Sequence, residues 1–301
     1  MNTSYKILYI VGMTHSGSTL LDLLIAKNSL AVSVGEVWQL ANLANTRYKK
    51  DAKTLLGNEC TCGAETIWHC SFWPRIDAVV QREGGISLRD LDLNSDDPET
   101  FRLHNKLIFD AVAEVTGARI IIDSSKIQSR LAKLVAAGFV EILPLHLMRD
   151  PRGQVCSIVH RVHRLQHSVF RPSLRYCRET LATVMFLHGR PHLSVQYENL
   201  ALDPPGELRR IMEWTGLAYE PAQLAWTDQV THNIDGNVMR RSTSNEIRSD
   251  EKWRERLTIG QKIAIRALTL PAVAMARLWE RTKGPAAKPL DMAVPPRSKS
   301  A

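Results

Sequence analysis

The sequence predicts an α/β fold of three layers, with a mostly parallel central sheet flanked by helices on both faces. Two observations predict this class. Near the N-terminus, a short apolar run is followed at once by a glycine-containing polar turn and then by an apolar helix, which is how an α/β unit opens. Along the rest of the chain, short apolar runs alternate with longer segments of helical periodicity, and such alternation favours parallel strands joined by crossover helices.

Five segments are predicted to be strands, because each is short, apolar and bounded by polar residues or glycine. Residues 6–11 form the first strand, and the second ends near Gly35. The run Arg-Ile-Ile-Ile-Asp at 119–123 is apolar throughout its centre, as expected of a strand buried within a parallel sheet. The last two strands are expected at 145–148 and 192–197.

Capping signals bound several of the predicted helices. Asp-Pro-Glu at 97–99 places a capping acid, a proline and a further acid at the start of a helix that ends near Gly117. Asp-Pro at 150–151 repeats this signature for a helix that runs to about residue 166. Further helices are expected at 18–28, 126–138, 171–188, 204–215 and 259–279.

Residues 1–283 are predicted to form a single domain. Within it, residues 45–96 show few long apolar periods and carry a cysteine cluster, so we expect an irregular insert there. Residues 284–301 are rich in Pro, Ala, Lys and Ser, a composition typical of a disordered tail.

The formal net charge of +8 suits an anionic partner. Basic residues do not form a long stripe interleaved with aromatics, so nucleic acid is not expected as that partner. The apolar run at 7–11 ends at Gly12, too early for a signal peptide. The most apolar long segment, 259–279, is interrupted by basic residues and a proline, so we expect an amphipathic helix, no membrane span and a cytoplasmic protein.

The strongest local signal is segment 12–19, Gly-Met-Thr-His-Ser-Gly-Ser-Thr, between the first strand and the first helix. Glycines let backbone N–H groups approach a phosphate, and a helix N-terminus attracts anions. The NTPase form of such a loop, GxxxxGK[ST], has a lysine where this chain has Ser18. Because that lysine neutralises the phosphates of a triphosphate, its absence argues against an ATPase, a GTPase or a kinase. A glycine turn that binds nothing is the alternative interpretation.

The loop resembles the 5′-phosphosulfate loop of sulfotransferases that use 3′-phosphoadenosine 5′-phosphosulfate (PAPS). The family forms PKSGTT and RSGS[ST] are similar to His-Ser-Gly-Ser-Thr at 15–19, with His15 at the position of the family's loop lysine. The resemblance implies a P-loop-like sulfotransferase fold and a loop that binds the 5′-phosphate and the sulfate. The residues that it assigns to this contact are Thr14, His15, Ser16, Gly17, Ser18 and Thr19.

A second segment matches the same family further along the chain. In that family an arginine at a strand end and a serine eight residues later bind the 3′-phosphate, and Arg149 and Ser157 have this spacing. Arginine offers phosphate a bidentate fork, and a helix beginning at Pro151 returns the serine to the same side about two turns later. A local ion pair between Arg149 and Asp150 is the alternative for the first of these residues.

Two more segments resemble parts of the family's nucleotide site. Tyr197 opens a Tyr-Glu-Asn-Leu stretch similar to one that lies near the nucleotide. A loop at 232–241 is loosely similar to one that closes over the 3′-phosphate, which makes Arg240 and Arg241 candidates for that contact.

Sulfuryl transfer needs a base for the acceptor's proton and positive groups near the leaving oxygen. Glu36, at the end of the second predicted strand, is the preferred base, and His15 and Asp123 are the alternatives. A solvated acid in a turn is the competing interpretation of Glu36. Asp123 and Lys126 are the ends of an Asp-Ser-Ser-Lys segment that resembles one in the family, in which Lys126 would steady the sulfuryl group and Asp123 would orient it or the acceptor. A helix cap at Ser124 or Ser125 is the alternative there.

Cys60, Cys62 and Cys70 cluster beside His69. The four residues could ligate zinc, but their spacing is not that of a standard zinc finger. We expect a cluster of thiols or one local disulfide rather than zinc, so no metal site is predicted. Sulfuryl transfer itself requires no metal.

The sequence therefore predicts a transferase that moves a sulfuryl group from PAPS, by in-line displacement, to a hydroxyl or amine of a small-molecule, lipid or glycan acceptor. The insert at 45–96 is expected on the acceptor side. The alternatives are a P-loop kinase or NTPase, and a non-catalytic protein that binds anions or glycans.

Overall fold

The computed structural model describes residues 4–40, 60–161, 168–234 and 238–282. Its centre is a sheet of five parallel strands in the order β2-β3-β1-β4-β5. The strands are β1 (Lys6–Val11), β2 (Ala31–Gly35), β3 (Ile120–Lys126), β4 (Glu141–Met148) and β5 (Leu193–Gln196). The parallel sheet and all five predicted strands are confirmed. The predicted tail and residues 45–59 of the predicted insert lie outside the described residues.

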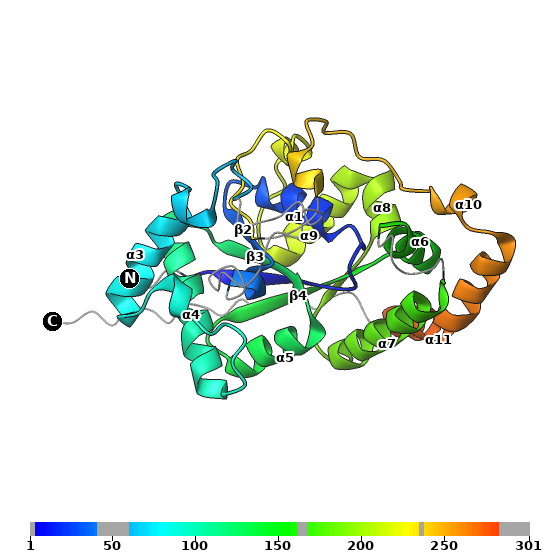
Figure 1. Ribbon diagram of the computed structural model, residues 1–301, viewed down its shortest axis with the longest axis horizontal. Helices are drawn as coiled ribbons and strands as arrows, with labels where there is room; N and C mark the ends of the chain where they lie inside the picture. Colours follow the sequence, from blue (N-terminus) through cyan, green and yellow to red (C-terminus); the bar gives the residue numbers. More distant parts are fainter. Residues whose placement is uncertain (1–3, 41–59, 162–167, 235–237, 283–301) are drawn as a thin grey trace.

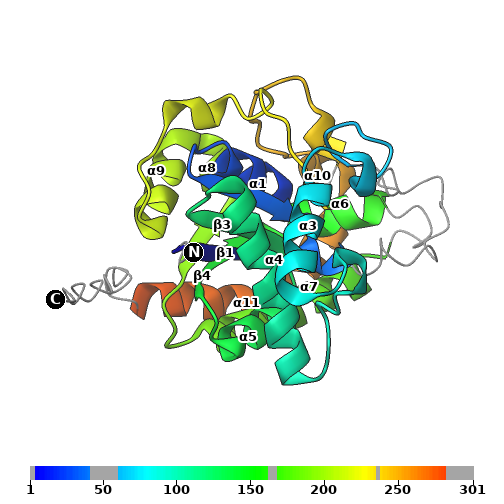
Figure 2. The same ribbon diagram turned by 90° about the vertical axis from the view of Figure 1, so that its left-hand side faces the viewer.

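Helices cover both faces of the sheet, as Figures 1 and 2 show. Side chains alternate along a strand, so Leu8 and Ile10 of β1 pack on one face while Ile7 and Tyr9 pack on the other. The helices over the first face are α1 (Ser18–Ala26), α8 (Tyr197–Leu202) and α9 (Pro204–Thr215). Those over the second face are α3 (Trp73–Gly84), α4 (Pro98–Thr116), α5 (Gln128–Ala137) and α7 (Phe170–Leu187).

The last helices pack beside α7. The helix that follows β4, α6 (Pro151–Arg161), contacts α7, and α11 (Ile259–Thr282) packs against both, while α10 (Trp253–Arg256) contacts α6. Among the described residues, α11 is the one helix long and apolar enough to cross a membrane, and 22% of its apolar window is buried. It leaves Ile263 and Leu270 exposed. The absence of a membrane span therefore stays a prediction.

The prediction of an irregular insert is wrong for residues 73–84, which form α3. Pro74 lies in its first turn, and Gly85 ends it with a φ of 67°. Trp73, Ile76 and Val80 lie at helical spacing and are buried. This apolar pattern is only 12 residues long, so it gives a weak signal within the irregular sequence around it.

A boundary also differs from the sequence-based expectation. Strand β3 continues to Lys126, and α5 begins only at Gln128. Lys126 has a left-handed φ of 69°, which ends the strand and separates it from the helix. The short 3-10 segments are η1 (Val37–Gln39), η2 (Ile67–His69), η3 (Leu88–Asp90), η4 (Pro221–Leu224) and η5 (Val238–Arg241).

Candidate active site

A cleft of about 830 Å³ lies at the carboxyl ends of the strands, the edge at which α/β proteins bind ligands. Lys126 at the end of β3 lines it, as do residues in the segments that follow the other four strands. The residues that the sequence singled out and that line this cleft are Thr14, His15, Gly17, Ser18, Thr19, Glu36, Lys126, Arg149, Ser157 and Tyr197. The structure thus brings the predicted loop, the predicted arginine–serine pair and the preferred base to one cavity.

The loop after β1 leads into the N-terminus of α1. Gly17 is the N-cap of this helix with a φ of 96°, and a Cβ there would lie 2.4 Å from the ring of Tyr197, so only glycine fits. The first turn of α1 holds no acidic side chain, and its first N–H groups have no partner within the helix. Such a helix start binds anions.

Ser16, a predicted member of the loop contact, does not line the cleft. Its side chain is buried, and its Oγ has no hydrogen-bond partner among the described residues.

Two side chains from α6 and its N-terminal flank hold the loop in place. The carbonyl oxygen of Thr14 accepts a hydrogen bond from Gln154 Nε2 at 2.7 Å, and that of His15 accepts one from Arg149 Nη1 at 2.9 Å. His15 itself has a left-handed φ of 65°, an uncommon conformation for a residue with a Cβ. Because the carbonyl oxygens are held by these donors, the conformation of the loop is fixed before a ligand arrives.

Arg149 follows β4 and faces the cleft together with Ser157. Its side chain is 6% exposed and lies over the ring of Tyr197, with 4.6 Å between the guanidinium carbon and the ring centroid. Its Nη2 donates to Asp250 Oδ2 at 3.1 Å. A guanidinium that faces a cleft and is paired with one carboxylate can exchange that carboxylate for a phosphate.

The acidic partner of Arg149 is Asp250 and not the adjacent Asp150. Burial alone would raise the pKa of Asp250, but the hydrogen bond and the charge of Arg149 outweigh it and hold that pKa below its ordinary value. Asp150 instead accepts the backbone N–H of Arg152 at 2.8 Å and pairs with the Arg152 guanidinium. The alternative of a local Arg149–Asp150 pair is therefore wrong, while the predicted cap by Asp150 is present.

The cleft is also lined by residues of segment 246–252, which no sequence pattern singled out. This segment brings two cations, Arg248 and Lys252, beside the carboxylate of Asp250. Tyr197 fixes the segment, because its hydroxyl donates to the carbonyl oxygen of Arg248 at 3.2 Å. The segment is polar and has neither helical nor strand periodicity, so the basic residues themselves are the signal that could have found it.

Glu36 and Lys126 form an ion pair inside the cleft. Their side chains are 13% and 11% exposed, so each is shielded from bulk water but open to the cavity. The backbone N–H of Glu36 donates to the carbonyl oxygen of Ile234 at 2.8 Å, and Lys126 Nζ also donates to the carbonyl oxygen of Ser124 at 3.2 Å. A carboxylate and an ammonium held side by side can accept a proton and stabilise an anion in one place.

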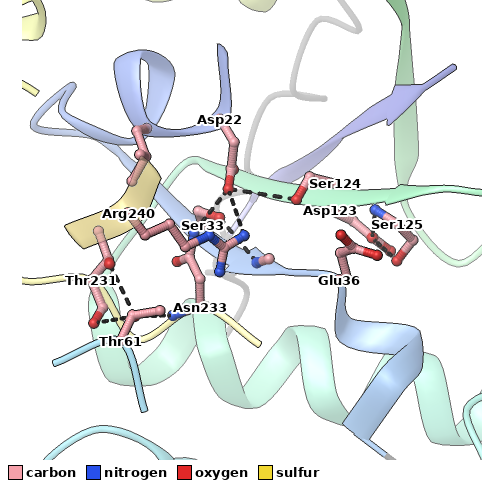
Figure 3. A network of polar contacts seen from close by, with 12 residues as sticks. Asp22, Ser33, Glu36, Thr61, Asp123, Ser124, Ser125, Thr231, Asn233 and Arg240 are labelled. Carbon is pink, nitrogen blue, oxygen red and sulfur yellow. Dashed lines mark hydrogen bonds and ion pairs between the residues drawn. The ribbon is translucent and has the colours of Figure 1, made fainter. Parts of the chain in front are cut away.

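The structure does not bring Asp123 or Arg240 into the cleft. Asp123 is fully buried and pairs with Arg130, with 3.4 Å between the nearest atoms. The Arg240 side chain is 2% exposed and lies 3.6 Å from Asp22 Oδ2. Both residues belong to buried polar contacts beside the sheet, which Figure 3 shows. The side chain of Arg241 lies outside the described residues.

Asp22 is the centre of the second of these contacts (Figure 3). Its Oδ2 accepts from Asn233 Nδ2 at 2.8 Å and from Ser124 Oγ at 3.5 Å. Burial raises the pKa of Asp22 to about 6, although the charge of Arg240 lowers it. This network ties α1 to the residues that precede η5, and because none of its members lines the cleft, its role is structural.

Comparison with known proteins agrees with this geometry. A family model described as the sulfotransferase family matches residues 8–221, which is more than half of the chain. Human carbohydrate sulfotransferase 6 is 27% identical over 159 residues, and the match covers 44% of this chain and 40% of that protein.

Two solved structures share the fold. The sulfotransferase domain of the Synechococcus PCC 7002 olefin synthase has a TM-score of 0.55 at 18% identity, covering 91% of this chain and 94% of that domain. The sulfotransferase domain from the curacin biosynthetic pathway has a TM-score of 0.53 at 17% identity, covering 87% and 96%. Because the family match runs from β1 through the loop and Arg149 to the end of the sheet, this chain belongs to the sulfotransferase family.

Proposed function

We propose that the protein transfers the sulfuryl group of PAPS to a hydroxyl or amine of a small-molecule, lipid or glycan acceptor. One observation carries the proposal: a single cleft contains a helix N-terminus, a buried arginine and a paired carboxylate and ammonium. The N-terminus of α1 would be the first anion site, and Arg149 with Ser157 would be the second. A donor with phosphates at both its 3′ and 5′ positions needs two such sites.

The loop at 14–19 would hold the 5′-phosphosulfate, and Arg149, Ser157 and Tyr197 would hold the 3′-phosphate. Arg248 and Lys252 would contribute further positive charge at the 3′ end, since both line the cleft beside Arg149. Arg241 is a further candidate for contact with the 3′-phosphate. Arg240 receives no such role, because its side chain is buried against Asp22.

Glu36 would act as the general base. The acceptor oxygen or nitrogen attacks sulfur, the bond from sulfur to the bridging oxygen breaks, and its electron pair passes to the 5′-phosphate. The acceptor's proton goes to the carboxylate of Glu36, which is paired with Lys126. Lys126 and His15 would stabilise the charge on the sulfuryl and bridging oxygens, so the step needs no metal ion in this proposal.

We place this reaction in the cytoplasm. None of the five cysteines forms a disulfide, as is typical of a protein in a reducing compartment. The acceptor would enter near Trp38 and Gln39, which line the cleft beyond Glu36.

Calorimetry with adenosine 3′,5′-bisphosphate, without magnesium, tests the donor site. We expect micromolar binding, about −8 kcal/mol, and a loss of at least about 100-fold in Arg149→Ala because a buried phosphate partner is removed. Arg152→Ala is the matched control, since Arg152 pairs with Asp150 and does not line the cleft. Failure of the bisphosphate to bind, or preferential binding of magnesium–ATP, would overturn the proposal in favour of an NTPase.

A further inference from the structure

Three cysteines and one histidine from distant parts of the chain meet beside α3. Cys60, Cys62 and Cys70 precede this helix, and His232 lies 172 positions beyond Cys60. Their four potential ligand atoms all lie within 4.8 Å of one another. His69, the histidine adjacent to Cys70 in sequence, is not among them; its Nδ1 is hydrogen-bonded to Thr66 Oγ1 at 2.9 Å.

We propose that Cys60, Cys62, Cys70 and His232 bind one structural zinc ion. Zn–S bonds of about 2.3 Å and Zn–N bonds of about 2.0–2.1 Å in a tetrahedron place sulfur and nitrogen ligands about 3.6 Å apart. Cys60 Sγ lies 3.6 Å from His232 Nδ1. Three thiolates and an imidazole complete the tetrahedron and leave no open position, which is typical of a structural and not of a catalytic zinc.

The surroundings of Cys70 and His232 are those of a metal site. Cys70 Sγ accepts the backbone N–H groups of Phe72 at 3.4 Å and Trp73 at 3.3 Å, and such donors stabilise a ligating thiolate. The ring of Phe72 stacks on that of His232 with 5.0 Å between centroids and 9° between planes. Trp73 Nε1 donates to the carbonyl oxygen of His232 at 2.8 Å. The imidazole is therefore held in one orientation by the start of α3.

The residue between the first two cysteines joins the two halves of the ligand set. Thr61 Oγ1 donates to the carbonyl oxygen of Thr231 at 2.6 Å and accepts the backbone N–H of Asn233 at 3.0 Å, as Figure 3 shows. These two residues flank His232 on either side. The Cys-x-Cys turn and the histidine are thus fixed in register by contacts that do not themselves involve a ligand atom.

The zinc ion would also fix the backbone of the catalytic carboxylate. Ile234, two residues after His232, donates its N–H to the carbonyl oxygen of Val34 at 3.1 Å and accepts the N–H of Glu36 at 2.8 Å. A Cβ on Gly35 would lie 2.4 Å from the Ile234 carbonyl oxygen, so this contact is tight. The proposal replaces the expectation of plain thiols or a disulfide, and it assigns the ion a positioning role outside the cleft.

Elemental analysis of the full chain, purified without a metal-chelating column, tests the proposal. We expect one zinc per chain. His232→Ala should weaken zinc binding by at least about 100-fold, because loss of a ligand costs no less than loss of its outer partner. His232→Cys, which restores a four-ligand set, should keep the ion, and His69→Ala is the matched control that should bind zinc as the unaltered chain does.

Thiol labelling provides a measurement that does not depend on the folding of a variant. In the unaltered protein, Cys60, Cys62 and Cys70 should resist alkylation until a chelator is added, at which point zinc is released. Zinc-free protein with these three thiols reactive, a disulfide among them, or iron in place of zinc would each overturn the proposal. Because the readout is metal content, its failure is distinct from failure of the donor site.

Discussion

The two halves of the active site are built in different ways. The donor half, the loop before α1 with Arg149 and Ser157, lies at junctions between a strand and the helix that follows it. The acceptor half, around Glu36, depends on Ile234, which pairs with the end of β2 although about two thirds of the chain separates them in sequence. The difference teaches that the proposed donor half is positioned mainly by strand-to-helix junctions, whereas the position of the proposed base depends on tertiary assembly.

The largest expected effect is on kcat, and it would show that the acceptor half can be altered without changing nucleotide binding by the donor half. Glu36→Gln should lower kcat by about 10²- to 10⁴-fold, the usual contribution of a general base. The affinity for adenosine 3′,5′-bisphosphate should stay within about 2-fold, because Glu36 has no place in the donor half. Steady-state kinetics and calorimetry on the same preparation measure both.

His15 provides the alternative outcome for this experiment. If Glu36→Gln keeps nearly full kcat while His15→Asn loses it, the base lies in the donor loop and the two halves are not separate in function. A pH–rate profile of each variant assigns the base, since only loss of the base removes the acidic limb.

The second effect concerns Asp22, which supports the acceptor half through Asn233. Burial raises the pKa of Asp22 from 3.8 to about 6 despite the charge of Arg240. Between about pH 4 and pH 6, the folded protein therefore keeps the proton on Asp22 while the unfolded chain has lost it. The contribution of Asp22 to the free energy of unfolding falls by about 3 kcal/mol as the pH rises through this range. Asp22→Asn cannot ionise and should not show this loss.

This pH-dependent loss of stability is measured by urea unfolding of the unaltered protein and of Asp22→Asn between pH 4 and pH 7. Other carboxylates titrate in both proteins and cancel in the difference. The free energy of unfolding of the unaltered protein should decline relative to that of the variant as the pH rises. A difference that is constant with pH would show that Asp22 is ionised throughout and firmly paired with Arg240.

The same contrast explains what the sequence could predict. The five strands could be predicted because each is a short apolar run, and the helix starts because capping acids and proline act on neighbouring residues. The roles of the loop and of the Arg149–Ser157 spacing could be predicted because each resembles a short segment of a known family. His232 could not be identified as a partner of the cysteines, since 172 positions separate it from Cys60 and only the packing of Phe72 and Trp73 brings it close. Segment 246–252 lies in the cleft for a similar reason, through a contact with Tyr197 that no pattern in the sequence records.

The third effect tests whether the donor half is as local as proposed. Gly17→Ala would place a Cβ 2.4 Å from the Tyr197 ring at a φ of 96°, which costs about 1–3 kcal/mol in backbone strain. The affinity for adenosine 3′,5′-bisphosphate should fall by about 10- to 100-fold. Gly216→Ala is the control, because Gly216 also has a positive φ, of 80°, but a Cβ there would meet open space away from the cleft.

Circular dichroism and calorimetry on both glycine variants give the measurement. Equal loss of nucleotide affinity in the two would mean that the effect is general destabilisation. Loss in Gly17→Ala alone would show that the loop geometry itself binds the nucleotide.

The smallest effect should increase affinity. The Asp250 carboxylate accepts a hydrogen bond of 3.1 Å from the Arg149 guanidinium, where we propose that the 3′-phosphate binds. The hydrogen bond and the charge of Arg149 keep the pKa of Asp250 below its ordinary value, although burial raises it. Asp250→Asn removes this competing charge and should tighten binding of adenosine 3′,5′-bisphosphate by about 1.5- to 5-fold, the range of a partly exposed charge pair. Glu251→Gln removes the same charge from the same cleft wall but from a carboxylate that pairs with Arg254, so it should change affinity less. Equal gains in the two variants would mean that nucleotide affinity depends on the total charge of the cleft and that Asp250 is not a specific competitor. Weaker binding in Asp250→Asn would mean that this carboxylate positions Arg149 for the phosphate. The donor half would then depend on tertiary assembly as well.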